Sequence, residues 1–144
     1  MNRIISGSWA IKFAVFFLST QAFAQNEQFI PVLGYRTGAY AVSGLPYVTG
    51  EVDYYRLINE RDGGINGVKI LFEECETGYA TDRGLECYER LKGKGPTGAA
   101  FVAPMSTGVT FVLTNKTDTD RIPLVTPGYG RQRMGQCSSG IFRC

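Results

Sequence analysis

Two neighbouring hydroxyl residues, Ser106 and Thr107, stand where this sequence could hold an anion. They follow the apolar run Ala99–Ala103 and precede a stretch typical of a helix. Free backbone N–H groups and the helix dipole attract negative charge at a helix N-terminus, and hydroxyls add donors there. In the alternative interpretation the same hydroxyls only cap the helix. From spacing alone, capping is the simpler interpretation.

Three glutamates, Glu73, Glu74 and Glu76, gather at the end of a second β-leaning run. Carboxylate oxygens are the ligands of hard metal ions. A solvated strand end explains the same cluster without a metal, and we expect that arrangement. The glycine-rich stretch 94–98 precedes a strand and opens no helix with Gly-Lys-Ser/Thr, so it is not expected to bind a nucleotide phosphate.

The sequence contains no histidine. A hydrolase needs a base beside its nucleophile, and no Gly-x-Ser-x-Gly turn follows a strand. Zinc is not expected either, because no short paired-cysteine spacing occurs. We therefore expect neither a hydrolase nor a metal site.

Four cysteines lie at positions 75, 87, 137 and 144. Cys75 ends the second strand and Cys87 falls in the next helix, so a disulfide between them is plausible in an exported chain. Two buried free thiols remain the alternative, because a sequence does not show the separation that a disulfide requires.

Alternating apolar runs and helical periodicity predict the elements that position these residues. The predicted strands are Phe29–Leu33, Val68–Glu73, Ala99–Ala103 and Arg121–Thr126, and the predicted helices are Pro46–Arg61, Thr81–Lys92 and Thr107–Thr119. Pro31 argues against a fully paired first strand, which we expect to begin near Val32.

Each predicted helix carries a buried stripe and end signals. Gly63 and Gly64 stop the first helix, the pair Asn66-Gly67 makes a tight turn, and Thr81 or Asp82 suits an N-cap. The predicted inward residues are Val48, Val52, Tyr55 and Ile58 in the first helix, Leu85, Tyr88, Leu91 or Lys92 in the second, and Val109, Val112 and Leu113 in the third.

Four strand–helix repeats with short connections predict an α/β fold, a Rossmann-like parallel sheet with helices on both faces. Ligands bind such sheets beyond the carboxyl ends of the strands. Three loops with suitable side chains meet that condition: Tyr35–Ser43, Met105–Gly108 and Thr126–Gly130.

Residues 1–24 have the pattern of a secretory signal peptide. Arg3 and Lys12 supply charge, Phe13–Leu18 is a short apolar core, and cleavage is expected after Ala24. The apolar core is shorter than the ~20 residues that a membrane-spanning helix needs. Removing these residues takes the net charge from +2 to zero, and nothing then favours nucleic acid as a partner.

Several motifs together resemble a known family. They are Tyr35-Arg-Thr-Gly, Asn59–Lys69, Glu73–Tyr79, Thr81-Asp-Arg-Gly, Glu86–Leu91, Gly95–Ala100, Ser106-Thr-Gly and Gly128-Tyr-Gly-Arg. The string resembles periplasmic substrate-binding proteins of ABC transporters, of the branched-chain amino-acid (leucine/isoleucine/valine-binding) type. The likeness covers about Phe29–Arg131, and residues 25–131 would form part of the N-terminal lobe of a type I periplasmic binding protein.

The resemblance implies a two-lobed, hinged protein in the periplasm that closes on a small ligand and delivers it to an ABC permease in the inner membrane. It also implies that the protein is not an enzyme and needs no cofactor. The ligand carboxylate would rest on Ser106 and Thr107. Further contacts would come from the last loop and the first loop, and the full set of expected ligand residues is Ser106, Thr107, Thr126, Gly128, Tyr129, Tyr35 and Tyr40. Pro104-Met105 departs from the more polar loop of well-known members, so amides, urea-like ligands or other amino acids stay open.

The segment 132–144 shows no family likeness and no clear period. Its codons, taken one frame over, permit residues that the family has at this point, so we expect a frameshifted tail on a truncated chain. Such a fragment is expected to bind ligand weakly, because one wall of a cleft buries little of a ligand. A ligand-sensing domain of a regulatory system and a non-functional gene product remain alternatives.

Overall fold

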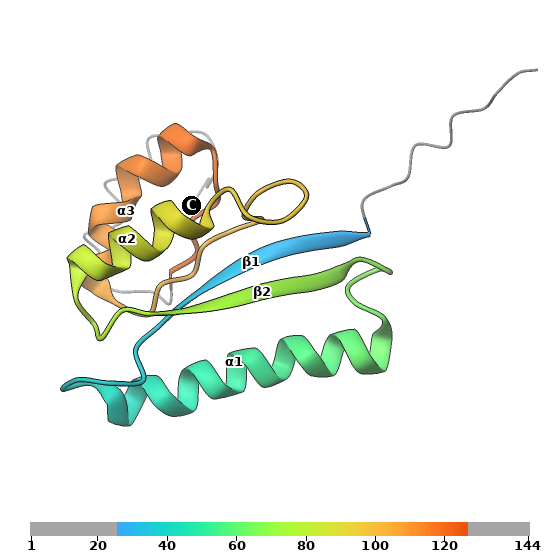
Figure 1. Cartoon of the computed structure of the whole chain (residues 1–144), viewed down its shortest axis with the longest axis horizontal. Helices are drawn as coiled ribbons and strands as arrows, with labels where there is room; N and C mark the ends of the chain where they lie inside the picture. The colour runs from blue at the N-terminus through green and yellow to red at the C-terminus, as the bar shows by residue number, and fades with distance from the viewer. Residues whose placement is uncertain (1–25, 127–144) are drawn as a thin grey trace, which may run out of the picture.

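The computed structural model describes residues 26–126, in which two helix layers enclose a parallel sheet (Figure 1). The predicted signal peptide, Gly128, Tyr129 and the segment 132–144 lie outside the described residues. The elements in chain order are β1 (Glu27–Gly34), α1 (Ala41–Asp62), β2 (Lys69–Glu76), α2 (Thr81–Leu91) and α3 (Thr107–Asp120).

β1 and β2 pair in parallel from Glu27–Lys69 to Gly34–Glu76. Two further parallel contacts extend the sheet: Phe29 bridges Ala99, and Val102 bridges Leu124. The predicted third and fourth strands were therefore wrong as full strands, although both segments run in the predicted direction beside β1 and beside each other. The third segment makes two isolated bridges and the fourth makes one, so the pairing is too sparse for a continuous ladder.

Pro31 lies inside β1, so the expectation that the strand begins near Val32 was wrong. The carbonyls of Asn26 and Gly34 accept bonds from the β2 side, whereas the carbonyl of Phe29 accepts from Ala100. Because peptide groups alternate between the two edges of a strand, the nitrogen of Pro31 faces the sparsely paired edge. Its missing N–H therefore removes no bond between β1 and β2.

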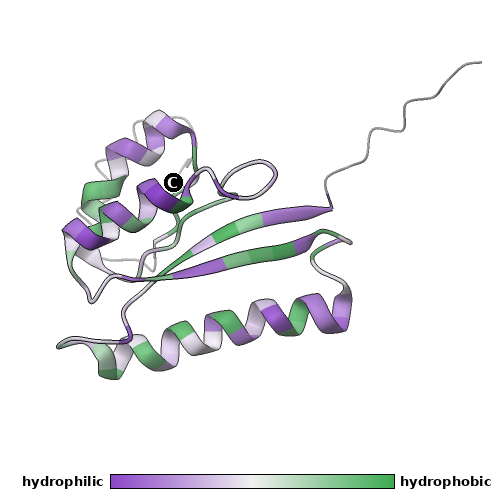
Figure 2. Cartoon of the chain, viewed as in Figure 1, coloured by the Kyte–Doolittle hydropathy of each residue, from purple (hydrophilic) through white to green (hydrophobic). Residues whose placement is uncertain are grey.

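The side chains of β1 alternate between the two helix layers. Ile30 and Val32 pack with Ile70 against α1, and Phe29 and Leu33 pack against α2 and α3. Figure 2 shows the hydrophobic middle of β1 and of β2 between these layers. The predicted α/β fold, with helices on both faces of a parallel sheet, is confirmed.

α1 begins at Ala41, five residues before the predicted start, and includes Pro46. Proline near the start of a helix costs one hydrogen bond, here to the carbonyl of Val42, whose residue is 89% exposed. The predicted stripe of Val48, Val52, Tyr55 and Ile58 is buried as expected.

The joint between α1 and β2 is confirmed in detail. Gly63 takes the left-handed C-cap conformation with φ of 71°. Ile65 and Val68 bond to each other across the turn at Asn66-Gly67. The Asn59 side chain then bonds both the N–H and the carbonyl of Ile70, which ties the end of α1 to the outer edge of β2.

The two helices on the other face differ from prediction at two points. Ala80 is the N-cap of α2 and makes no side-chain cap bond, so Thr81 and Asp82 were wrong as caps. The predicted inner face of α2 is confirmed, because Tyr88 and Leu91 are fully buried and the partly buried Leu85 packs against the same core. Val112 is 41% exposed; Thr110 and Thr117 take the inner face of α3 instead, with their hydroxyls bonded to helix carbonyls four residues earlier.

Candidate functional site

The carboxyl ends of the strands meet at one edge of the sheet, and three described loops leave from it. Figure 1 shows this edge at the left, where β1 passes into the loop before α1 and β2 passes into the turn before α2. The third loop, 104–106, leads into α3. The Val102–Leu124 bridge brings the start of this third loop close to Thr126, the last described residue.

Ser106 is the N-cap of α3 and is 3% exposed. Its hydroxyl oxygen accepts the N–H of Val109 at 3.3 Å, and its carbonyl accepts the Thr110 hydroxyl at 2.7 Å. The capping interpretation therefore holds. Within the part of the chain that the structure describes, no acceptor takes the Ser106 hydroxyl proton, so capping leaves one donor for a ligand.

Thr107 and Gly108 occupy the first two positions of α3. The N–H groups at such positions have no partner within the helix, and no bond from either N–H to another residue of 26–126 is recorded. The Thr107 side chain is partly buried. The helix start thus combines two backbone donors and two hydroxyls, a set suited to a carboxylate or an amide oxygen.

Tyr35 and Tyr40 lie on the first loop with different surroundings. Tyr35 is 4% exposed, whereas Tyr40 is 55% exposed. Between them lies Tyr79, whose ring centroid is 5.0 Å from that of Tyr35 and 4.3 Å from that of Tyr40. The sequence pattern did not predict Tyr79 as a residue of this edge, because the loop after β2 stands out by its acidic residues. Its one available signal was an aromatic residue just beyond a strand end.

Tyr79 has a positive φ of 65°, which is unusual for a residue with a bulky side chain. Thr77 holds this turn: its hydroxyl accepts the N–H of Tyr79 at 3.2 Å and donates to the carbonyl of Gly34 at 2.8 Å. The turn after β2 is therefore anchored to the end of β1, and it sets the ring of Tyr79 between the two tyrosines of the first loop.

The acidic cluster positions the first loop rather than a metal. Glu76 accepts bonds from the N–H groups of Arg36, Thr37 and Gly78 and from the Thr37 hydroxyl. Burial acts to raise the pKa of Glu76, but these donors outweigh it and lower that pKa overall. The Glu74 carboxylate accepts two hydrogen bonds from the Arg36 guanidinium, and Glu73 forms an ion pair with Lys94. Among residues 26–126, no group of three His, Cys, Asp or Glu side chains could hold a metal ion.

Glu51 of α1 is a carboxylate near this cluster that forms no ion pair with a residue of 26–126. Burial and the negative charge of Glu74 raise its pKa, opposed by a 2.8 Å bond from the Tyr55 hydroxyl. Because the folded pKa lies above the unfolded value, the carboxylic acid form favours folding. Glu51 then destabilises the fold progressively as pH rises through its folded pKa.

We expect Glu51→Gln to raise the free energy of unfolding at pH 7, by up to about 1 kcal/mol. Glutamine keeps an oxygen for the Tyr55 hydroxyl and removes the poorly solvated charge. The gain should become small near pH 4, where Glu51 is protonated in the folded state and mostly protonated in the unfolded chain. Urea unfolding of both proteins between pH 4 and pH 8 measures this difference, and a gain that is equal at every pH would contradict the charge argument.

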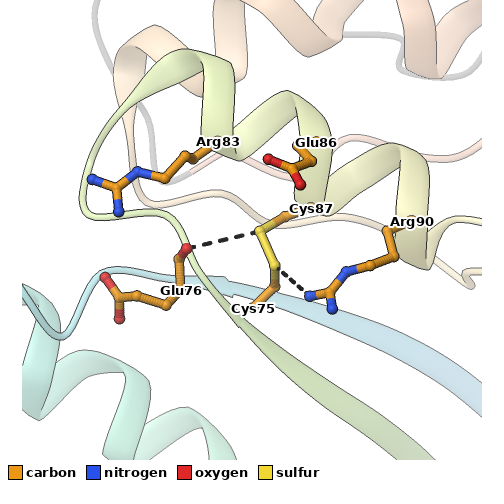
Figure 3. Close-up of a pocket in the computed structure, with 6 residues that line it drawn as sticks. All are labelled: Cys75, Glu76, Arg83, Glu86, Cys87 and Arg90. Atoms are coloured by element: carbon orange, nitrogen blue, oxygen red, sulfur yellow. Dashed lines mark hydrogen bonds between the residues drawn. A yellow bond between two sulfur atoms is a disulfide. The ribbon is translucent and has the colours of Figure 1, made fainter.

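A pocket of about 330 Å³ lies beside this edge, lined by Cys75, Glu76, Arg83, Glu86, Cys87 and Arg90 (Figure 3). Cys75 and Cys87 form a disulfide with a Cα–Cα distance of 5.8 Å. The bond ties the end of β2 to the middle of α2. None of the expected ligand residues lines this pocket.

No helix between residues 26 and 126 is long and apolar enough to cross a membrane. Comparison with known proteins then identifies the family. A family model described as periplasmic binding protein matches residues 27–144. The match includes the segment 132–144, so the expectation that the family likeness ends near Arg131 was wrong. No curated protein matches this chain.

Several solved structures share the fold. One, described as an ABC transporter permease from the Pseudomonas fluorescens group, is 41% identical with a TM-score of 0.70, and the match covers 76% of this chain and 27% of that one. A branched-chain amino-acid ABC transporter from Thermus thermophilus with bound valine is 19% identical with a TM-score of 0.63, covering 76% and 28%. A fatty acid ABC transporter substrate-binding protein from Thermomonospora curvata is 17% identical with a TM-score of 0.62, covering 72% and 25%.

The match spans about a quarter of the length of these three structures. The two more distant structures support the fold, and the family model supports more than the fold because it extends over most of the sequence. The chain belongs to the periplasmic binding protein family.

Proposed function

We propose that this chain contributes one wall of the ligand cleft of an ABC importer's substrate-binding protein, for branched-chain amino acids or related amides and urea. The start of α3 carries the proposal. In a member of this family, this helix start offers two backbone N–H groups that bond to no residue of 26–126, together with the hydroxyls of Ser106 and Thr107. It lies at the edge where ligands of parallel sheets bind.

The ligand carboxylate or amide oxygen would rest on this helix start, and Thr126 would approach from the neighbouring segment. The proposed contacts Gly128 and Tyr129 lie outside the described residues. Tyr35 is buried and would pack beneath the ligand site without touching the ligand, whereas the exposed Tyr40 would contact the ligand directly. Export through the signal peptide and delivery to a permease complete the proposed role.

The contact of one wall alone buries only part of a ligand, so we expect weak, millimolar affinity from the chain by itself. Titration of the ¹⁵N-labelled chain with leucine, valine, acetamide and urea, followed by NMR, can detect such binding. At least one of these ligands should shift the amide signals of Thr107 and Gly108 first. Shifts confined to the far edge of the sheet, near the Asn66-Gly67 turn, would contradict the proposal.

Thr107→Val tests the hydroxyl without disturbing the cap at Ser106. It should weaken binding of the responding ligand several-fold, because it removes one hydrogen bond worth about 1 kcal/mol. Its free energy of unfolding should stay near that of the parent, since no described residue bonds the Thr107 hydroxyl. The matched control is Thr119→Val, at the other end of α3, where the hydroxyl bonds the Asn115 carbonyl; it should leave the ligand titration unchanged.

A further inference from the structure

The pocket around the Cys75–Cys87 disulfide treats the two sulfur atoms differently. The Arg90 guanidinium donates to Sγ of Cys75 at 2.8 Å. Sγ of Cys87 instead lies 4.0 Å from the carbonyl oxygen of Glu76. Figure 3 shows Arg90 reaching Cys75 and the Glu86 carboxylate on the Cys87 side of the bond. The sulfur of Cys75 therefore has a cation beside it, whereas the sulfur of Cys87 has acceptor groups on its side of the bond.

This asymmetry matters once the disulfide is broken. A thiolate is stabilised by a neighbouring arginine and destabilised by a neighbouring carboxylate. Cys75 would therefore persist as a thiolate beside Arg90. Cys87 would be better placed as a neutral thiol, whose S–H could donate to the Glu76 carbonyl. In thiol–disulfide exchange, the sulfur that better supports negative charge is the better leaving group.

The pocket itself offers a place for the attacking thiol. Cys75 and Cys87 are only 7% and 4% exposed, so a thiol has to reach the disulfide through this pocket of about 330 Å³, which both cysteines line. Arg83 stands on the first turn of α2 at the pocket, and no hydrogen bond or ion pair from its guanidinium to a residue of 26–126 is recorded. A guanidinium in this position suits a carboxylate. Glu86 on the same wall suits an ammonium group, so the lining matches a zwitterionic thiol.

We propose that this pocket is a thiol–disulfide exchange site for a small thiol that bears carboxylate and ammonium groups, such as glutathione or cysteine. The incoming thiolate attacks Sγ of Cys87 and forms a new S–S bond to it. The Cys75–Cys87 bond breaks, and its electron pair leaves on Sγ of Cys75 as a thiolate held by Arg90. The product is Cys87 in a mixed disulfide with the small thiol, so no external oxidant or reductant is needed for this step.

Opening the disulfide by exchange would affect the candidate ligand site, because the residues between the two cysteines contact it. The disulfide spans residues 75–87, which include the Thr77–Tyr79 turn and the first half of α2. A Cβ at Gly84 would contact Val109 of α3, and a Cβ at Gly108 would contact Thr81 of α2, so the two helices pack closely at their starts. Opening the bond releases the covalent tie that holds this assembly to β2.

The test uses the full chain with Cys137→Ser and Cys144→Ser in every protein, so that only the Cys75–Cys87 pair can exchange. Glutathione at pH 7 starts the reaction, rapid alkylation stops it, and peptide mass spectrometry locates the adduct. We expect glutathione on Cys87 and the alkyl group on Cys75. Glutathione found mainly on Cys75 would overturn the assignment of the leaving sulfur.

Arg90→Gln should slow the exchange about three- to tenfold, because the leaving thiolate loses its cation. Arg90→Lys keeps the positive charge and should exchange at close to the parent rate. The control Arg61→Gln removes an exposed arginine of α1 that pairs only with Asp62 and should have no effect. Arg90→Gln could also exchange faster because it unfolds the chain. A second measurement covers that case: the rate of alkylation of Cys75 as a function of pH in the variant Cys87→Ser.

That pH profile should give Cys75 a pKa below the ordinary thiol value of about 8.5. An ordinary or raised pKa would overturn the proposal.

Arg83→Gln should slow exchange with glutathione about threefold and leave exchange with 2-mercaptoethanol, which has no carboxylate, unchanged. If Arg83→Gln slows both reactions equally, or slows neither, Arg83 does not bind the carboxylate of the thiol. The site would then have no preference for a carboxylate-bearing thiol.

Discussion

Gly44→Ala is expected to lower the free energy of unfolding by about 3 kcal/mol, the upper part of the range for overpacking in a core. Gly44 is buried in the first turns of α1. A Cβ there would overlap the carbonyl oxygen and the ring of Tyr35. Neither can retreat easily, because Tyr35 follows directly on β1 and its ring contacts Tyr79. The start of α1 would have to move away from the sheet.

The matched control is Gly50→Ala in the same helix. No heavy atom lies within 4 Å of a Cβ built at Gly50, so alanine there should stabilise the fold by roughly 0.5–1 kcal/mol through helix propensity. Urea unfolding of the two variants and the parent then gives changes of opposite sign for one chemical substitution. Equal changes would show that propensity, and not the contact with Tyr35, decides the role of Gly44.

The close approach at Gly44 illustrates what the sequence could not reveal. The apolar spacing of Val48, Val52, Tyr55 and Ile58 was enough to predict the buried stripe of α1. The start of the helix was not predictable in the same way, because Pro46 and Gly44 both weaken a helix locally. Tertiary contact with Tyr35 overrides that weakness, and propensity alone contains no information on such contacts.

The third helix shows a related limit. Val112 is apolar and was predicted inward, yet Thr110 and Thr117 are buried in its place. Their hydroxyls bond to carbonyls of the preceding helical turn, which removes most of the cost of burying a polar group. A hydrophobic pattern that counts threonine as polar therefore predicts the buried face of α3 in the wrong place, rotated by part of a helical turn.

The candidate site was predictable where it depends on topology. Parallel strands with short connections bring their carboxyl ends to one edge, so the loops that carry Tyr35, Ser106 and Thr126 could be grouped before any coordinates. The contribution of Tyr79 depends on a turn with positive φ that Thr77 holds by two hydrogen bonds. Such side-chain bonding across 43 residues is not encoded in any local pattern.

Replacing both cysteines, as Cys75→Ser with Cys87→Ser, is expected to lower the free energy of unfolding by about 3 kcal/mol. The disulfide joins residues 12 apart in sequence, and closing a loop of that size restricts the unfolded chain by about this amount. A domain of this size has roughly 5–15 kcal/mol in total. Urea unfolding at pH 7 measures the loss. With Cys137→Ser and Cys144→Ser in both proteins, dithiothreitol should leave the double variant Cys75→Ser, Cys87→Ser unaffected.

The reduced parent provides a sharper comparison than the oxidised one. Dithiothreitol should lower its stability toward that of the double variant, but not fully, because a Cys75 thiolate beside Arg90 stabilises the reduced fold. A thiol whose folded pKa is lowered contributes stability above its unfolded pKa and loses it as pH falls through the folded pKa. The gap between reduced parent and double variant should therefore be largest near pH 9 and close as pH falls.

A gap that is independent of pH would mean that Arg90 packs beside the disulfide without stabilising a thiolate. The 3 kcal/mol loss would remain, since loop closure does not depend on the charge of either sulfur. The two measurements thus separate the covalent contribution of the disulfide, which acts on the unfolded chain, from the electrostatic contribution of Arg90, which acts on the folded one. Only the second bears on whether this disulfide exchanges with small thiols.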